Sequence, residues 1–137
     1  MKRLLIVEDD PNTLSGLLEL LSDEGYKVYG VTHGNEALKV AAKRPFDMVL
    51  SDYSLPDING LQVCRELKRL QPGLILFLAT AFYDFDIIDK AREYGISKIF
   101  TKPIIVDIFL KILSICSDQL NIQEQNAYTF DAQKLTA

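Results

Sequence analysis

Acidic side chains follow two apolar segments of the chain, at the point where each segment ends. Leu4-Leu5-Ile6-Val7 runs directly into Glu8 and Asp9, and Met48-Val49-Leu50-Ser51 runs into Asp52. Short apolar runs bounded by turn-forming residues predict buried strands. Ligands of open parallel sheets bind beyond the carboxyl ends of the strands, so the place of Asp52 suits chemistry. A single aspartate after a strand more often opens a turn, however, and Asp52 alone does not decide between the two.

Two more predicted strands end in side chains that complement these acids. Thr80 follows the apolar run 74–79, and Lys102 follows the short run 99–101. Carboxylates gathered at low dielectric repel one another, and a divalent cation with oxygen ligands, such as Mg²⁺, offsets that repulsion. A lysine ammonium and a threonine hydroxyl suit an anionic phosphoryl group. These residue types together predict phosphoryl transfer to the Asp52 carboxylate.

Each of these residues also has an ordinary structural explanation. Glu8 and Asp9 could be solvated loop acids. Thr80 could cap the helix that follows it, and Lys102 could be a surface charge before Pro103. Their joint occurrence at four strand ends is what favours a chemical site over four unrelated residues.

Strands and helices alternate along the chain. The apolar pattern predicts strands over 4–7, 27–31, 46–50, 74–79 and 99–101. It predicts helices over 11–24, 35–44, 61–70, 84–94 and 104–120, several of which end at glycine or proline. Such alternation implies parallel βαβ units with helices on both faces. The expected fold is α/β, a five-stranded doubly wound parallel sheet with five helices.

Composition and charge restrict the class of protein. The 137 residues suit one domain, and the formal net charge of −4 argues against nucleic-acid binding. No apolar run approaches the roughly 18 residues that span a bilayer, and the N-terminus lacks the pattern of a secretory signal. We therefore expect a cytoplasmic protein without a membrane partner. Cys64 and Cys116 lack metal-ligand spacing, which predicts two reduced thiols.

In their order and spacing these motifs resemble the receiver domain of two-component response regulators. The motifs are Ile6-Val7-Glu8-Asp9-Asp10-Pro11, Asp52-Tyr53-Ser54-Leu55-Pro56-Asp57-Ile58-Asn59-Gly60, Thr80-Ala81 and Lys102-Pro103. The resemblance implies a flavodoxin-like fold with strand order 2-1-3-4-5 and a receiver domain over residues 1–120. It leaves residues 121–137 as a polar tail or the start of a linker.

The resemblance also implies what the acids do. Asp52 is the expected acceptor of a phosphoryl group from the phosphohistidine of a sensor histidine kinase or phosphotransfer protein. Mg²⁺ is the expected cofactor, held by the side chains of Glu8, Asp9 and Asp52 and by the main-chain oxygen of Ser54. The chain is then a phosphoacceptor signalling module that promotes its own phosphorylation and dephosphorylation, and not an enzyme in the ordinary sense.

The remaining motif residues have implied roles in the switch. Thr80 is the expected switch hydroxyl, the main-chain amide of Ala81 lies near the phosphate, and Lys102 contacts the phosphoryl group. The Lys102–Pro103 peptide bond is expected to be cis, an isomer that proteins keep only at particular sites.

The chain departs from the family pattern at one position and carries informative residues at two others. Members usually carry an aromatic residue three positions before the lysine, where this chain has Ile99. Phe100 comes next, but strand alternation directs it to the opposite side of the sheet, so it cannot substitute. Ser54 and Phe82 stand at the two positions that tune dephosphorylation, and neither suits the positioning of a water, which predicts a phosphorylated form that lasts minutes or more.

The predicted last helix carries a row of isoleucines beside the residues expected to face the sheet. The row consists of Ile105, Ile108, Ile112 and Ile115. If exposed, this row predicts a homodimer interface on the face of the fourth helix, fifth strand and fifth helix. The alternative is a rotated helix in which the same isoleucines belong to the core.

Two other classes of protein share parts of this pattern. A phosphatase with an aspartyl intermediate would carry a second aspartate two residues after the nucleophile, where this chain has Ser54. A flavodoxin-like electron carrier would carry a polar phosphate loop after the first strand, where Glu8-Asp9-Asp10 would repel a flavin phosphate. Both fit the sequence less well than a receiver.

Overall fold

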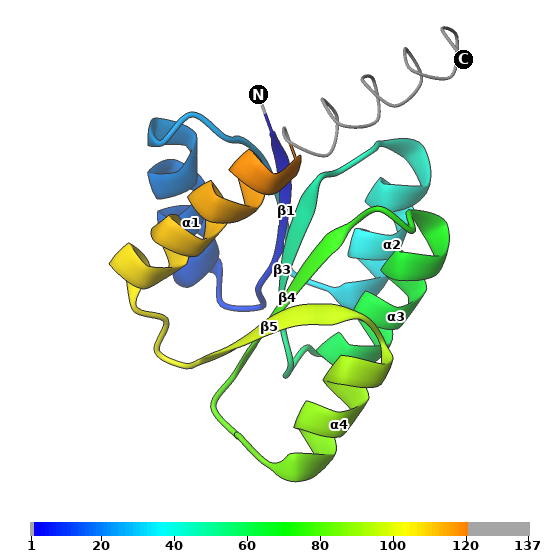
Figure 1. Ribbon diagram of the computed structural model, residues 1–137. Helices are drawn as coiled ribbons and strands as arrows, with labels where there is room; N and C mark the ends of the chain where they lie inside the picture. The colour runs from blue at the N-terminus through cyan, green and yellow to red at the C-terminus, as the bar shows by residue number, and fades with distance from the viewer. Residues whose placement is uncertain (1, 121–137) are drawn as a thin grey trace, which may run out of the picture. The chain divides into compact units, whose positions relative to one another are not determined.

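The computed structural model describes residues 2–120, and these form a five-stranded parallel sheet with five helices (Figure 1). The strands are β1 (Arg3–Val7), β2 (Lys27–Val31), β3 (Met48–Asp52), β4 (Ile75–Thr80) and β5 (Ile96–Thr101). The labelled helices are α1 (Pro11–Asp23), α2 (Gly34–Lys43), α3 (Gly60–Leu70) and α4 (Phe85–Glu93), and a further helix spans residues 106–120. The strand order β2-β1-β3-β4-β5 confirms the predicted α/β doubly wound fold.

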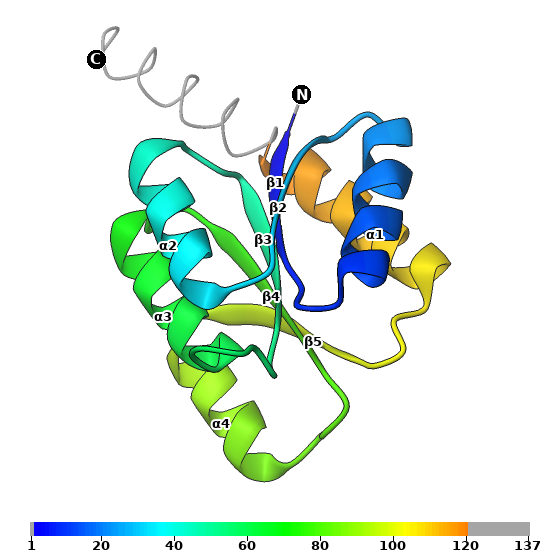
Figure 2. The ribbon, with the colours of Figure 1, turned by 180° about the vertical axis from the view of Figure 1, so that it is seen from behind.

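The chain divides into two compact units, Met1–Pro103 and Ile104–Ala137. The first unit holds the sheet and α1 to α4, with α1 on one face and the other three helices on the opposite face (Figures 1 and 2). The second unit holds the helix over residues 106–120. The predicted tail or linker over residues 121–137 lies outside the described residues.

The central strands are covered on both faces, which explains their continuous apolar sequences. All five residues of β3 are buried, and β4 is buried from Leu76 to Thr80. Side chains of α2 and α3 complete the core on their side of the sheet, among them Ala37, Ala41, Val63, Cys64 and Leu67. Asp52 therefore ends a strand that has no exposed residue, and its own side chain is buried.

Cap residues begin the helices, and glycines follow the ends of two of them. Asp10 caps α1 by accepting a hydrogen bond from the Thr13 amide at 3.0 Å, and Pro11 is the first helical residue. Gly25 and Gly95 follow α1 and α4 with φ of +94° and +78°, a conformation that favours glycine.

Several predicted boundaries are wrong. The third strand runs from Met48 to Asp52, not from 46 to 50, because Asp52 still pairs with Ala79 of β4. The fifth strand begins at Ile96, three residues before the prediction of 99. Exposed Ser97 and Lys98 interrupt its apolar pattern, and a register shift beside Leu76 and Phe77 interrupts its pairing. The fourth helix begins at Phe85, with Asp84 as its cap, and the last helix begins at residue 106 instead of 104.

Two expectations from the sequence concern membrane-spanning helices and the two cysteines. No helix within residues 2–120 is both long enough and apolar enough to cross a bilayer. Cys64 and Cys116 are both free, as predicted, and removal from water raises the pKa of the Cys64 thiol to about 12. The Cys64 thiol therefore stays protonated and packs as a small apolar side chain.

Candidate functional site

The three predicted acids meet at the carboxyl edge of the sheet. Glu8 and Asp9 follow β1, and Asp52 ends the neighbouring strand β3, whose Ser51 pairs with Val7. Glu8, Asp9 and Asp52 each offer a carboxylate oxygen within 4.8 Å of the others. Glu8 and Asp52 are buried and Asp9 is exposed, so the cluster is open to solvent on one side.

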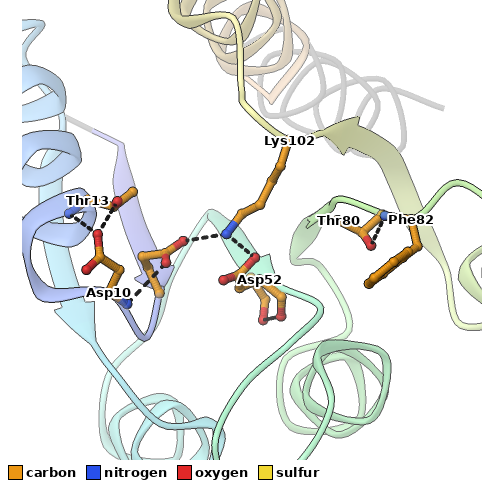
Figure 3. Close-up of polar contacts among 8 residues, drawn as sticks. Asp10, Thr13, Asp52, Thr80, Phe82 and Lys102 are labelled. Carbon is orange, nitrogen blue, oxygen red and sulfur yellow. Dashed lines mark hydrogen bonds and ion pairs between the residues drawn. The ribbon is translucent and has the colours of Figure 1, made fainter.

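Lys102 reaches this cluster from the other side of β4. It follows β5, and its Nζ lies 2.6 Å from Oδ1 of Asp52 and 3.2 Å from Oε2 of Glu8 (Figure 3). Its main-chain N–H donates to the Thr80 carbonyl at 2.8 Å, which ties the base of the side chain to the end of β4. One ammonium therefore balances part of the charge of two buried carboxylates.

Burial determines the proton affinity of the central carboxylate. The pKa of Asp52 is raised to about 6, because removal from water and the charge of Glu8, which both raise it, outweigh the opposing effect of Lys102. Removal from water lowers the pKa of Lys102, but its contacts with Asp52 and Glu8 outweigh that cost and raise it overall. At neutral pH, Asp52 is therefore mainly an ionised carboxylate beside a fully charged lysine.

Thr80 and Ala81 lie one strand away from Asp52. Asp52 pairs with Ala79, so the next residue of β4, Thr80, stands beside the acidic cluster. The Thr80 side chain is buried, and its Oγ1 accepts a hydrogen bond from the Phe82 amide at 3.0 Å (Figure 3). Ala81 is exposed between these two residues. Thr80 ends its strand and does not cap α4, since Asp84 fills that position.

The loop that joins β3 to α3 carries the predicted main-chain ligand Ser54. Tyr53 donates its amide to the Ala79 carbonyl, and Gly60 donates its amide to the Tyr53 carbonyl, each at 2.8 Å. A Cβ at Gly60 would overlap the main-chain oxygen of Asp52, so only glycine permits this approach. Ser54 is exposed directly after this closed neck.

Sequence reasoning gave no role of its own to a second carboxylate of this segment, Asp57. Its Oδ1 and Oδ2 accept the amides of Gly34 and Asn35 at 2.9 and 2.8 Å, so it caps α2 from outside. His33 stands before α2 and makes no side-chain cap. The helix was predicted to begin at residue 35, and no local pattern of the sequence pointed to Asp57 as the partner of its first amides.

The expected alternation of the two residues before Thr101 is confirmed. Ile99 packs on a cluster of α3, β4 and α4 residues, whereas Phe100 contacts the ring of Phe77, with centroids 5.8 Å apart. Phe100 therefore does not supply the aromatic ring that is missing at the position of Ile99. The Lys102–Pro103 bond is cis, as the resemblance implies.

The isoleucine row lies in the second compact unit. Ile105, Ile108 and Ile115 are exposed, with 63%, 49% and 49% of their surface accessible, and Ile112 is half-buried. Their exposure disfavours the alternative that all four are core residues. An interface formed by them stays a prediction.

The donor set fits a hard divalent cation. Carboxylate and carbonyl oxygens are the ligands that Mg²⁺ prefers, and three carboxylates within 4.8 Å of one another meet that requirement. The cluster contains no thiolate or imidazole that would favour a softer metal.

Comparisons with known proteins agree on one family. The family model described as the response regulator receiver domain matches residues 4–114. A response regulator receiver protein of Anaeromyxobacter is 35% identical over 112 residues, which are 82% of this chain and 47% of that protein. The transcriptional regulatory protein GlrR of Escherichia coli is 31% identical over 85% of this chain but only 26% of its own length. The chain thus spans less than half the length of these relatives.

A solved structure extends the likeness to the backbone. The crystal structure of a CheY-like response regulator receiver domain protein from Methanospirillum hungatei superimposes with a TM-score of 0.82 at 27% identity. The match covers 88% of this chain and 98% of that one.

Proposed function

Because the chain belongs to the response regulator receiver domain family, we propose that it is a switch operated by phosphorylation of Asp52. The observation that carries the proposal is the buried Asp52 carboxylate with Lys102 Nζ at 2.6 Å and two further acids around it. A buried carboxylate with a cation 2.6 Å away, at the carboxyl edge of the sheet beside exposed Asp9, supports its assignment as the phosphoryl acceptor.

The proposed reaction moves a phosphoryl group from nitrogen to oxygen. A carboxylate oxygen of Asp52 attacks phosphorus of a phosphohistidine, an O–P bond forms, and the N–P bond breaks with its electron pair returning to the imidazole ring. The raised pKa of about 6 still leaves Asp52 mainly ionised at neutral pH, as a nucleophile must be. Lys102 is close enough to follow the charge from the carboxylate to the acyl phosphate.

We propose that Glu8, Asp9, Asp52 and the main-chain oxygen of Ser54 hold Mg²⁺. When bound, the ion supplies charge neutralisation for the transferred oxygens. The chain's own contribution is to gather three acids and to keep Lys102 between two of them, so that the cluster carries less repulsion before the donor arrives.

The switch is assigned to the end of β4. We propose that the Thr80 hydroxyl leaves the Phe82 amide, from which it now accepts a hydrogen bond, and binds the phosphoryl group together with the Ala81 amide. Ile99 would then report the change through packing on α4, since it has no aromatic ring to rotate. Ser54 and Phe82 flank the site without an acid or amide side chain, which supports a phosphorylated form lasting minutes or more.

The proposed partners follow from this chemistry. A sensor histidine kinase or phosphotransfer protein would supply the phosphoryl group, in the cytoplasm. A second copy of the chain is a further candidate partner, through the row Ile105, Ile108, Ile112 and Ile115, three of which are exposed. The receiver domain boundary near residue 120 stays part of the same proposal.

Intact mass after incubation with acetyl phosphate tests the proposal. We expect one phosphoryl addition that requires Mg²⁺ and is absent from Asp52→Ala. Asp9→Ala should keep Asp52 but react slowly unless Mg²⁺ is raised, because it removes one ligand. An addition that survives in Asp52→Ala would overturn the assignment of the acceptor. Steady release of phosphate from many donors would favour a phosphatase over a switch.

A further inference from the structure

The loop between β3 and α3 is held at two separate points. Its neck is closed by the hydrogen bond between the Gly60 amide and the Tyr53 carbonyl. Its far end is held by Asp57, which binds the first two amides of α2 through both carboxylate oxygens. Ser54 lies between these two points, three residues before Asp57.

The attachment at Asp57 is built from several independent contacts. The first amides of a helix have no partner inside the helix, so an outside acceptor stabilises them, and a negative charge there also suits the helix dipole. Beside Asp57, the chain packs closely on the same helix start. A Cβ at Gly34 would lie 2.6 Å from Ile58 Cγ1 and 2.6 Å from Val63 Cγ2, so the glycine is needed for this approach.

The charge of this anchor is constant over the physiological pH range. Partial removal from water raises the pKa of Asp57, but the amides of Asn35 and Gly34 lower it more, to about 2. Asp57 is exposed, so its role does not come from burial in a core. Asp57 holds the loop against the first two residues of α2, Gly34 and Asn35, which lie 23 and 22 residues before it in sequence.

We propose that Asp57 is a positioning residue for the metal site, which keeps the main-chain oxygen of Ser54 in place for Mg²⁺ by fastening the loop to α2. Mg²⁺ requires near-ideal octahedral geometry, so a main-chain ligand on an unfastened loop binds it poorly. The inference rests on the proposed Mg²⁺ site and adds a residue that neither touches the ion nor the phosphoryl group.

The test compares three variants in two assays. Asp57→Ala removes both acceptors, Asp57→Asn keeps one, and Asp47→Ala is the matched control. Asp47 also accepts a main-chain amide, that of Arg3 at 2.7 Å, but it lies before β3 at the opposite end of the strand. Calorimetry measures the Kd for Mg²⁺ without any donor. Intact mass with acetyl phosphate measures the Mg²⁺ concentration at half-maximal rate and, separately, the maximal rate.

We expect Asp57→Ala to raise the Kd for Mg²⁺ and the half-maximal concentration by about tenfold, the lower range for an outer-sphere residue. The maximal rate should stay within about twofold of the parent. Asp57→Asn should fall between the two, and Asp47→Ala should lose folding stability with an unchanged Kd. A merely structural role would make Asp57→Ala behave like Asp47→Ala.

The outcomes separate this inference from the function on which it rests. An unchanged Mg²⁺ Kd in folded Asp57→Ala overturns the positioning role, whatever the parent's reactivity. A parent that binds Mg²⁺ but takes no phosphoryl group contradicts the proposed function. In that case a raised Kd for Mg²⁺ in Asp57→Ala still supports the inference. A parent that binds no Mg²⁺ overturns both.

Discussion

Two carboxylates of one segment, Asp52 and Asp57, are held in opposite ways. Asp52 is buried among acids, and its pKa is raised to about 6 because burial and Glu8 outweigh Lys102. Asp57 is exposed, and its pKa is lowered to about 2 because main-chain amides outweigh its partial removal from water. The comparison teaches that the fold disfavours the ionised form of the carboxylate at the strand end, where chemistry is proposed. The fold favours the ionised form of the carboxylate in the loop, where it serves attachment.

Asparagine at the two positions should break this comparison most sharply. Asp52→Asn removes the nucleophile and should abolish phosphoryl addition. Asp57→Asn keeps Asp52 and one acceptor oxygen, so addition should persist at saturating Mg²⁺. Intact mass with acetyl phosphate measures both. Equal loss in the two variants would contradict a division of labour between reaction and attachment.

Removal of the cation beside Asp52 should have the next largest effect. Lys102→Gln takes away the charge that lies 2.6 Å from Oδ1 and should slow phosphorylation about 100-fold. The Kd for Mg²⁺ should be unchanged or lower, since an ammonium no longer competes for the carboxylates. A Kd that rises in parallel with the loss of rate would mean that Lys102 organises the metal ligands instead of serving the phosphoryl group.

The pH dependence of stability sharpens the contrast in charge. The folded pKa of Asp52 lies above the unfolded value of 3.8, so the favourable contribution is complete below about pH 4 and is lost as pH rises through about 6. Without Mg²⁺, Asp52→Asn should therefore be more stable than the parent at pH 7, by roughly 1–3 kcal/mol. The difference should vanish near pH 4. Urea unfolding in a chelator at both pH values measures it, and a less stable variant at pH 7 would contradict the sign.

The loop attachment should make the smallest difference to stability. Asp57→Ala removes an exposed helix cap and should cost about 0.5–2 kcal/mol at pH 7 in urea unfolding. Because the pKa of Asp57 is lowered, its contribution should be present above about pH 4 and lost as pH falls through about 2. A stability gain on replacing Asp57 would show that its charge is not favourably placed.

Strand ends explain how much of the site was predictable. Continuous apolar runs made β1, β3 and β4 visible, and the acids and Thr80 follow them directly, so their meeting at one edge could be inferred from parallel topology alone. The start of β5 could not be predicted from the sequence, because exposed Ser97 and Lys98 break its apolar pattern.

The contacts that were not predictable join residues far apart in sequence. Lys102 meets Glu8 across 94 residues, and Asp57 meets Gly34 across 23, so no local pattern records either pair. Residue types indicated that Glu8 and Lys102 belong to one site. Only the fold shows that Asp57 caps a helix whose own preceding residue, His33, makes no side-chain cap.

The most direct test of the central claim locates the phosphoryl group on the chain. After reaction with acetyl phosphate and Mg²⁺, borohydride reduction converts an aspartyl phosphate to homoserine, and peptide mass spectrometry finds the converted residue. The structure predicts conversion at Asp52 alone, with Asp9 and Asp57 unchanged. Conversion at Asp57 or Asp9, or at several acids equally, would contradict the assignment of the buried strand-end carboxylate as the acceptor.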